Sequence, residues 1–260
     1  TNRLRSTTRD VSQYGFYRNK GLLWFIMPRI TNITLLSVGW EGRIFPTVKV
    51  RLFYKKSLSK TTIQSTRDEY SHQLLQKIGI KNTLNTTCVT LWGINDYTTR
   101  RKKMYPNCIF TLTDYAQNPT SDNALIEILV AHFSNQIVFF PQGSNDLKYI
   151  KTLDAYIKHR HLIVLLPHDY QQYKDFLLNN KEITYIGTRL HGGIFCMQHA
   201  IETLILEVDN RAEDMREGIN LPVVERTDYT SIKKWLASDL DFGDLKLPIH
   251  NISLWKNQFK

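Results

Sequence analysis

One stretch decides how this chain of 260 residues folds: Ile183-Thr184-Tyr185-Ile186-Gly187-Thr188-Arg189-Leu190-His191-Gly192-Gly193-Ile194. Its apolar start predicts a strand, and the sequence that follows predicts an amphipathic helix over 195–200 and a strand over 203–208. An arginine, a histidine and two glycines therefore stand where a strand gives way to a helix N-terminus. Free N–H groups and the helix dipole favour anions there, and a histidine can move a proton near neutral pH.

The second half of the chain alternates short β-rich runs with helix-like stretches. Strict alternation predicts a parallel sheet of about five strands with right-handed crossovers. Ser121 is the expected N-cap of the first of these helices. The predicted strands are 108–113, 136–140, 162–166, 183–186 and 203–208, and the predicted helices are 122–133, 147–158 and 171–179.

The first half is less regular and reads as the trailing part of a second α/β domain. We predict strands over 33–38 and 61–64, and helices over 51–58 and 68–78. Gly79 is the expected residue that closes the second helix.

The predicted boundary gives an N-terminal α/β domain over 1–106 and a C-terminal Rossmann-like domain over 107–260. A helical stretch from Asp228 onward is expected to pack back on the first domain. The chain begins with Thr1 rather than Met, so we expect it to be trimmed or to lack its first strand.

Composition narrows the partners. Lysine and arginine total 34 against 24 acids, a net charge of +10 that is partly concentrated in 51–56 and 100–103. A solvated face is the ordinary reading of one basic cluster, but the whole excess favours a partner that carries phosphate. The motifs of nucleoside triphosphate and dinucleotide sites are not found. Three scattered cysteines favour a reducing, cytoplasmic compartment and, without metal-ligand spacing, we expect no metal.

Polar residues follow every predicted strand of the second half, at the edge where open parallel sheets bind ligands. Two cations and an imidazole, Arg189, His191 and Arg211, would share one crevice. Each also has an ordinary reading: Arg189 paired with Glu207 or Asp209, His191 as a capping or core histidine, and Arg211 in a surface salt-bridge network. The loops concerned are Asp114-Tyr115, Pro141-Gln142-Gly143, Pro167-His168-Asp169, 188–192 and Asp209-Asn210-Arg211.

The first half offers Arg67 and Asp68 where a short strand opens a helix. Asp68 or Ser65 is a candidate cap of that helix. If the two domains face each other, Arg67 points across the cleft toward the anion site; the alternative is a cap with an exposed arginine.

Residues 186–194, followed by a strand and Asp209-Asn210-Arg211, resemble the signature of the polysaccharide pyruvyl transferase family. Thr66-Arg67-Asp68-Glu69-Tyr70-Ser71 is similar to the R-D-x-x-S element of that family. The resemblance covers roughly residues 33–236. It implies two Rossmann-like domains facing a cleft, as in GT-B glycosyltransferases, and phosphoenolpyruvate as the donor substrate without a cofactor. Arg189, His191 and Arg67 fall on positions that contact the donor, and Arg211 falls where many members carry lysine.

The implied chemistry transfers a pyruvyl group onto a lipid-linked or nucleotide-linked sugar of a surface-polysaccharide precursor, as a cyclic ketal. His191 is the candidate general acid or a ligand of the donor, and it forms the predicted catalytic group with Arg189 and Asp114. The base for the sugar hydroxyls is sought among Asp114, His168 and Asp209, in that order. The predicted substrate-binding residues are Arg67, Arg211, Gln142, Gly192 and Asp209.

Two other classes of function stay open. A GT-B-like glycosyltransferase would use Arg189 to neutralise the diphosphate of a nucleotide sugar. A non-catalytic basic module would bind nucleic acid or a membrane surface, but the expected interleaving of aromatic and basic residues on one face is not clear in the sequence. We expect no nucleic-acid partner, and a cytoplasmic protein that contacts the anionic inner face of the membrane.

Overall fold

The computed structural model describes residues 3–4, 31–40, 44–94 and 105–260. Contacts divide the chain into two compact units, residues 1–92 with 246–260, and residues 93–245. The sequence placed this division between residues 106 and 107, and it assigned the last helix to the second domain with the expectation that it packs back on the first. The contacts place it after Trp92 and give the last helix to the first unit.

The second unit is built on a six-stranded sheet in which every neighbouring pair is parallel. The strands lie in the order β7-β6-β5-β8-β9-β10, which is 3-2-1-4-5-6 in chain order within this unit. This is the order of dinucleotide-binding folds, and it reverses between β5 and β8. The strands are β5 (Cys108–Thr111), β6 (Ile137–Phe139), β7 (Ile163–Leu165), β8 (Thr184–Gly187), β9 (Glu202–Glu207) and β10 (Val223–Glu225).

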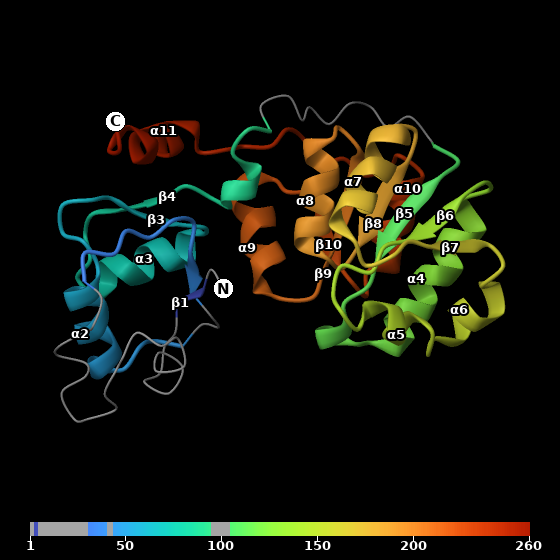
Figure 1. The fold of residues 1–260 in the computed structure, drawn as a ribbon, viewed down its shortest axis with the longest axis horizontal. Coiled ribbons are helices and arrows are strands. Elements are labelled where there is room, and N and C mark those ends of the chain that lie inside the picture. The colour runs from blue at the N-terminus through green and yellow to red at the C-terminus, as the bar shows by residue number, and fades with distance from the viewer. Residues whose placement is uncertain (1–2, 5–30, 41–43, 95–104) are drawn as a thin grey trace. The chain divides into compact units, whose positions relative to one another are not determined.

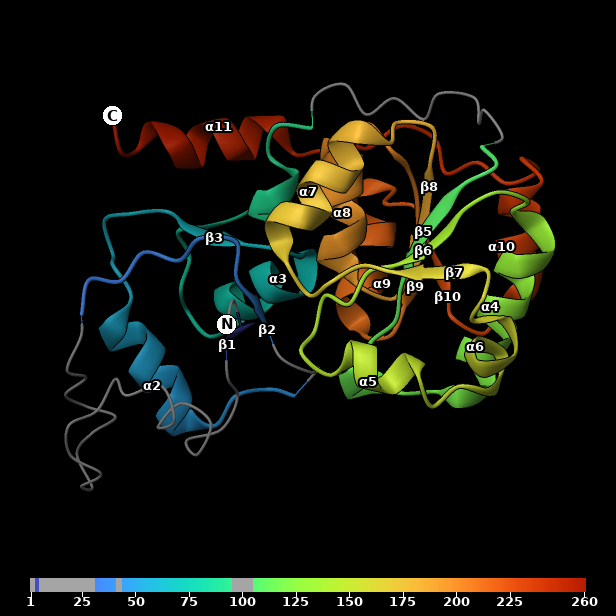
Figure 2. The same ribbon diagram turned by 45° about the vertical axis from the view of Figure 1, so that its right-hand side comes forward.

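Helices cover both faces of this sheet (Figures 1 and 2). Helices α4, α6 and α10 lie on one face, and α7, α8 and α9 on the other. The core between them includes Phe110, Phe139 and Ile186, none of which is exposed. The helices are α4 (Pro119–His132), α5 (Asp146–Ile150), α6 (Asp154–His159), α7 (Tyr170–Asn179), α8 (Leu190–Gln198), α9 (Asn210–Ile219) and α10 (Tyr229–Leu236).

The predicted α/β fold with a parallel sheet is confirmed, with three local corrections in this unit. Strand β10 was missed because its three residues, which follow Pro222 directly, show no clear period-two pattern. Helix α4 begins earlier than predicted, since the Asn118 side chain, not Ser121, caps it by accepting the Ser121 N–H. The predicted helix 147–158 is two helices, and Leu153 between them turns extended and buries its side chain.

Glycines let α8 lie close to the sheet. A Cβ on Gly193 would stand 2.6 Å from Cγ1 of Ile205 on β9, and one on Gly187 would stand 2.7 Å from the backbone nitrogen of Thr111 on β5. Such distances are shorter than van der Waals contact, so a side chain at either place would push neighbouring elements apart. The glycines of the deciding stretch therefore serve packing as well as the turn.

The first unit contains short parallel pairs. Strand β2 (Gly39–Trp40) pairs with β1 (Arg3–Leu4), β3 (Gln64–Thr66) pairs with β4 (Thr83–Asn85), and a bridge between Val38 and Thr66 links the two pairs. The strand expected at 61–64 therefore lies slightly later, at β3. Its helices are α2 (Val48–Ser57), α3 (Glu69–Lys77) and α11 (Ile249–Asn257).

Helix α3 matches its prediction closely. Asp68 caps it by accepting the Ser71 N–H at 2.7 Å, and Gly79 follows with a φ of +91°. A left-handed φ favours glycine because it has no Cβ. Of the two cap candidates, the structure selects Asp68 rather than Ser65.

Helix α11 packs on the first unit. The rings of Trp255 and Trp92 meet edge to face at 5.6 Å, and the Asn251 side chain donates to the Asn85 carbonyl at 2.9 Å. The helical stretch expected from Asp228 is thus two helices, α10 with Trp235 in the second unit and α11 with Trp255 in the first. In the described part of the chain, each helix is too short or too polar to pass through a bilayer.

Candidate functional site

The candidate site lies in the second unit, at the carboxyl ends of β5 and β8, where the strand order reverses. Two hydroxyls join the loops that leave these strands, because Thr113 Oγ1 and Thr188 Oγ1 are 2.7 Å apart. The Tyr185 hydroxyl donates to the Arg189 carbonyl at 2.8 Å and lies 2.6 Å from the Thr111 hydroxyl. These buried bonds hold the Arg189 turn in one position relative to β5.

Arg189 is fixed by a carboxylate that the sequence analysis did not select. Its Nε donates to Asp146 Oδ2 at 3.0 Å, and its Nη2 donates to Asp146 Oδ1. The same carboxylate accepts the Asp114 N–H at 3.0 Å and the Gly143 N–H at 2.6 Å. The Asp146 side chain is completely buried. One carboxylate therefore ties together the loops after β5, β6 and β8.

Asp114 shares the Arg189 guanidinium, accepting from Nη2 at 2.7 Å. Burial acts to raise the pKa of Asp114, but the hydrogen bond and the positive charge of Arg189 outweigh it and hold this pKa below its usual range. A carboxylate with a lowered pKa is a weaker base. Asp114, which the sequence ranked first as the general base, is therefore a weaker base than an unpaired aspartate.

Tyr115 stands between the two arginines that the sequence expected to share a crevice. The Arg189 guanidinium lies over its ring, 5.0 Å from the centroid, and Arg211 Nη2 donates to its hydroxyl at 2.7 Å. The Tyr115 side chain is 58% exposed. The two guanidinium groups therefore meet the same exposed side chain at one sheet edge.

Arg211 is also paired, as its ordinary reading expected. Its Nε lies 2.8 and 2.9 Å from the two carboxylate oxygens of Asp209, and its Nη2 donates to Asp209 Oδ2. Asp209 in addition caps α9 by accepting the Arg211 N–H at 3.0 Å. The acid Glu207, named as an alternative partner of Arg189, pairs with Arg216 at 3.1 Å.

Both arginines use the same edge to hold their carboxylates. Nε and Nη2 make the bonds, and Nη1 of Arg189 and of Arg211 has no hydrogen-bond partner among the residues that the structure describes. Each guanidinium keeps donors for a ligand while its direction is set by a carboxylate.

His191 lies in the first turn of α8 and is exposed. Arg189 is the N-cap residue of this helix but makes no side-chain cap, so its side chain does not occupy the N–H groups of the first turn. Gly192 is pressed against Gln142, since a Cβ there would stand 2.7 Å from Gln142 Oε1. That buried oxygen has no hydrogen-bond partner within the described ranges. Gln142 and Gly192 thus meet at the mouth of α8.

His168 follows β7 and is the second candidate base. Its Nδ1 lies 2.8 Å from the Pro141 carbonyl oxygen, which can only accept, so Nδ1 carries the proton. In the neutral ring the lone pair is then on Nε2. Pro141 belongs to the same loop as Gly143, where a Cβ would stand 2.0 Å from Arg189 Nη2.

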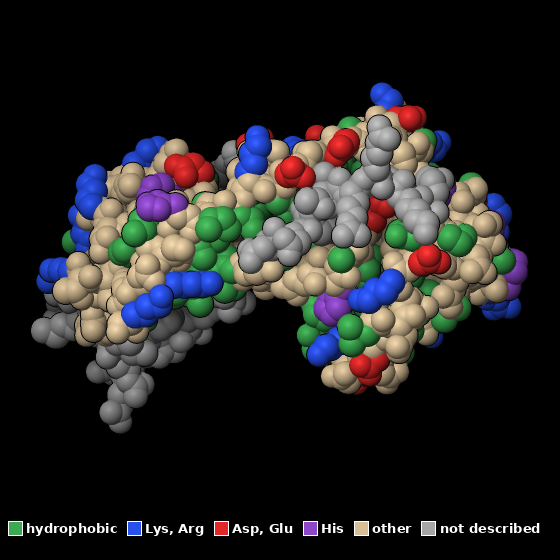
Figure 3. All heavy atoms as spheres, turned by 90° about the horizontal axis from the view of Figure 1, so that it is seen from above, with side chains coloured by type: hydrophobic (Ala, Val, Ile, Leu, Met, Phe, Trp, Pro, Cys, Tyr) green, Lys and Arg blue, Asp and Glu red, His purple; other side chains and the backbone are tan. Residues whose placement is uncertain are grey.

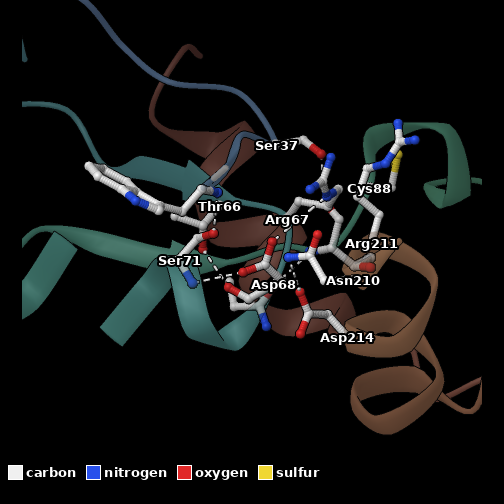
Figure 4. A network of polar contacts seen from close by, with 12 residues as sticks. Ser37, Thr66, Arg67, Asp68, Ser71, Cys88, Asn210, Arg211 and Asp214 are labelled. Atoms are coloured by element: carbon white, nitrogen blue, oxygen red, sulfur yellow. Dashed lines mark hydrogen bonds and ion pairs between the residues drawn. The ribbon is translucent and has the colours of Figure 1, made fainter. Parts of the chain in front are cut away.

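The first unit repeats this use of glycine. Arg67 follows β3 and is buried, and its Nε lies 3.7 Å from Asp68 Oδ2. Figure 4 shows the two side chains together. A Cβ on Gly39 would stand 2.0 Å from Arg67 Nη2, so the bare backbone of Gly39 makes room for the guanidinium. Asp68 both caps α3 and accompanies Arg67. The exposed arginine of the alternative reading is not observed.

Within the second unit, the structure brings together the predicted residues Arg189, Asp114, Arg211 and Asp209, and it places Gln142 beside Gly192. Asp146 and Tyr115 are site residues that were not predicted from the sequence. Asp146 reads as an ordinary residue of a polar turn, Ser144-Asn145-Asp146, and only its buried contacts with distant loops mark it. The described residues contain no group of three or more His, Cys, Asp or Glu side chains placed to hold a metal ion.

Comparison with known proteins gives a family and a fold. A sequence model described as polysaccharide pyruvyl transferase matches residues 7–210. No curated protein sequence matches the chain. Among solved structures, the chain is similar to the UDP-GlcNAc 2-epimerase of Methanocaldococcus jannaschii in complex with UDP-GlcNAc and UDP, with a TM-score of 0.52 and 12% identity over 86% of this chain and 69% of that one.

A second solved structure, UDP-N-acetylglucosamine 2-epimerase from Rickettsia bellii, has a TM-score of 0.46 and 10% identity over 79% of this chain. The present chain spans 60% of that protein. At such identities the first likeness shows a fold alone, and it is consistent with the predicted GT-B-like α/β architecture.

Proposed function

Because this chain belongs to the polysaccharide pyruvyl transferase family, we propose that it moves the pyruvyl group of phosphoenolpyruvate onto a sugar of a surface-polysaccharide precursor. The product is a cyclic ketal, and inorganic phosphate is released. The single observation that carries the donor assignment is the pair of guanidinium groups, Arg189 and Arg211, that meet at Tyr115 beyond the sheet.

The donor carries a phosphate and a carboxylate, and it needs donors that point in fixed directions. The Nη1 groups of Arg189 and Arg211 supply such donors, and the uncapped first turn of α8 adds backbone N–H groups beside His191. Gln142 and Gly192 shape the entrance to the turn.

The reaction needs one proton to reach the methylene carbon of the donor and two to leave the sugar. We assign the first to His191. One hydroxyl oxygen attacks the electron-poor carbon and loses its proton. The second hydroxyl oxygen then displaces phosphate and loses its own. Of the two protons that leave the sugar hydroxyls, one replaces the proton that was given to the methylene carbon, and the other leaves with the phosphate.

For the proton acceptor we propose His168 ahead of Asp114 and Asp209. The two carboxylates are engaged by Arg189 and Arg211, and the pKa of Asp114 is lowered by Arg189 against the effect of burial. His168 has its Nδ1 proton held by Pro141 and its Nε2 free to accept when the ring is neutral. His168→Gln should therefore lower kcat far more than Asp114→Asn.

The test follows phosphate release and the mass of the sugar when the protein is mixed with phosphoenolpyruvate and lipid-linked or nucleotide-linked acceptors. Arg189→Ala and His191→Ala should each lose most of the activity and stay folded by circular dichroism. Lys148→Ala, an exposed cation on α5, is the matched control and should retain it. Nucleotide release without consumption of phosphoenolpyruvate would replace the proposal with a glycosyltransferase.

A further inference from the structure

Helix α2 and the residues before it form an apolar and basic surface on the first unit. Four large apolar side chains there are unusually open to solvent: Ile44 is 64% exposed, Phe45 53%, Val48 59% and Leu52 40%. Lys49, Arg51, Lys55 and Lys56 lie on the same helix. We call these eight residues the α2 surface.

The α2 surface is one side of an amphipathic helix whose other side is already used. Val50, Phe53 and Tyr54 pack in the core of the first unit and are almost completely buried. Val48 and Leu52 are four residues apart, so they share a face. Single exposed apolar residues are ordinary on protein surfaces, but a neighbouring group of this size marks a contact with something else.

The stretch of sequence that contains helix α2 carries charge of one sign. The sequence from Gly42 to Arg67 contains no aspartate or glutamate, and it holds Arg43 and Lys60 in addition to the four cations of the helix. The Arg51 guanidinium lies 5.4 Å from the centroid of the Phe45 ring, which places a cation beside an exposed aromatic side chain. Figure 3 shows further lysine and arginine side chains on the first unit, seen from another side, together with acidic side chains.

We propose that the α2 surface docks on an anionic lipid bilayer. Aliphatic and aromatic side chains enter the boundary between headgroups and acyl chains, while lysines and arginines on the same helix attract anionic headgroups. A nucleic acid would use the cations but leave Ile44, Val48 and Leu52 against water, because its backbone offers nothing apolar. A bilayer satisfies both parts of the surface at once.

This surface lies on the first unit, and its use does not require that the proposed reaction is correct. If that reaction does act on a lipid-linked sugar, the docking surface would keep the protein at the membrane where such an acceptor resides. The binding experiment is therefore separate from the activity experiment.

The test is flotation of the purified chain with vesicles of phosphatidylcholine, alone or mixed equally with phosphatidylglycerol. The protein should float with the mixed vesicles, much less with phosphatidylcholine alone, and less as salt is added. Val48→Glu with Leu52→Glu should lower the partition coefficient at least tenfold. Lys55→Gln with Lys56→Gln should lower it about fivefold for each lysine.

Leu178→Glu is the matched control. Leu178 is a leucine on α7 that is 48% exposed, so the control adds an acid at a comparable site away from α2. Circular dichroism checks that each variant is folded, and transfer onto a soluble acceptor is measured in parallel and should be unchanged.

Three results would overturn the proposal. They are a wild-type chain that does not float, equal flotation with both kinds of vesicle, and acidic α2 variants that float like the wild type. If the wild-type chain does not float but sediments as a dimer, and the acidic α2 variants sediment as monomers, the α2 surface would instead be assigned to contact with a second copy of the protein.

Discussion

The substitution Asp146→Asn tests the arrangement that holds the candidate site. Asp146 accepts four hydrogen bonds, from the Asp114 and Gly143 N–H groups and from Nε and Nη2 of Arg189, and its side chain is completely buried. Asparagine has the same shape, but its NH2 group would face donors instead of accepting from them. The Arg189 charge, with a side chain only 11% exposed, would lose its main counter-ion.

The expected loss of stability follows from the hydrogen bonds and the ion pair that Asp146 makes. Removing one partner of a buried ion pair typically costs about 3–5 kcal/mol, and each hydrogen bond to a charged group contributes about 1.5–3 kcal/mol. We expect Asp146→Asn to lower the free energy of unfolding of the second unit by about 3 kcal/mol. That is a large part of the roughly 5–15 kcal/mol that stabilises a typical domain.

The assay is urea unfolding followed by circular dichroism, with amide hydrogen exchange of peptides from β5 and β8 to locate the change. Asp209→Asn is the matched control, because Asp209 holds Arg211 in a similar way but is 27% exposed, and asparagine still caps α9. It should cost about 1 kcal/mol or less. A cost for Asp146→Asn below about 1 kcal/mol, or equal to that of the control, would refute the reasoning.

Three further predictions concern pH, packing and thiols. Arg189 holds the pKa of Asp114 below its usual value of about 3.9, so the stability that this ion pair contributes should be fully present above that value and should be lost as pH falls through the lower pKa of the folded state. A carbon-13 NMR titration of Asp114 would measure this pKa, and a pKa at the usual value would contradict the pairing. Gly193→Ala should cost about 1–3 kcal/mol in urea unfolding, since the new Cβ would stand 2.6 Å from Ile205, whereas Gly218→Ala, with open space around it, should cost nothing. Burial raises the pKa of Cys196 to about 12, and Cys88 and Cys108 are buried too, so Ellman's reagent at pH 8 should label the cysteines only after unfolding; rapid labelling of the folded chain would contradict this burial.

Local patterns predicted the sheet and the turn well. Alternating strands and helices in the second half follow from apolar runs of the right length, and the turn from Gly187 to Gly193 carries its own signals of strand end and helix start. Strand β10 escaped because three residues after a proline carry almost no period. The order of the six strands also arises from packing that no local pattern specifies.

The charges of the site show where sequence reasoning ends. The positions of the cations on neighbouring loops predicted that Arg189 and Arg211 lie at one edge of the sheet, and in the structure both contact Tyr115. The same pattern did not predict that Asp146, 43 residues before Arg189, is the carboxylate that orients Arg189. Contacts between residues so far apart in sequence depend on the fold and cannot be predicted from a local pattern. In the structure, carboxylates fix the orientation of both guanidinium groups.

The most direct measurement of the central claim is amide hydrogen exchange with and without phosphoenolpyruvate. The account predicts slower exchange in peptides covering 111–116, 140–146 and 186–192, and the loss of this protection in Arg189→Met. Failure of phosphoenolpyruvate to bind, or binding that leaves all three segments unchanged, would contradict it.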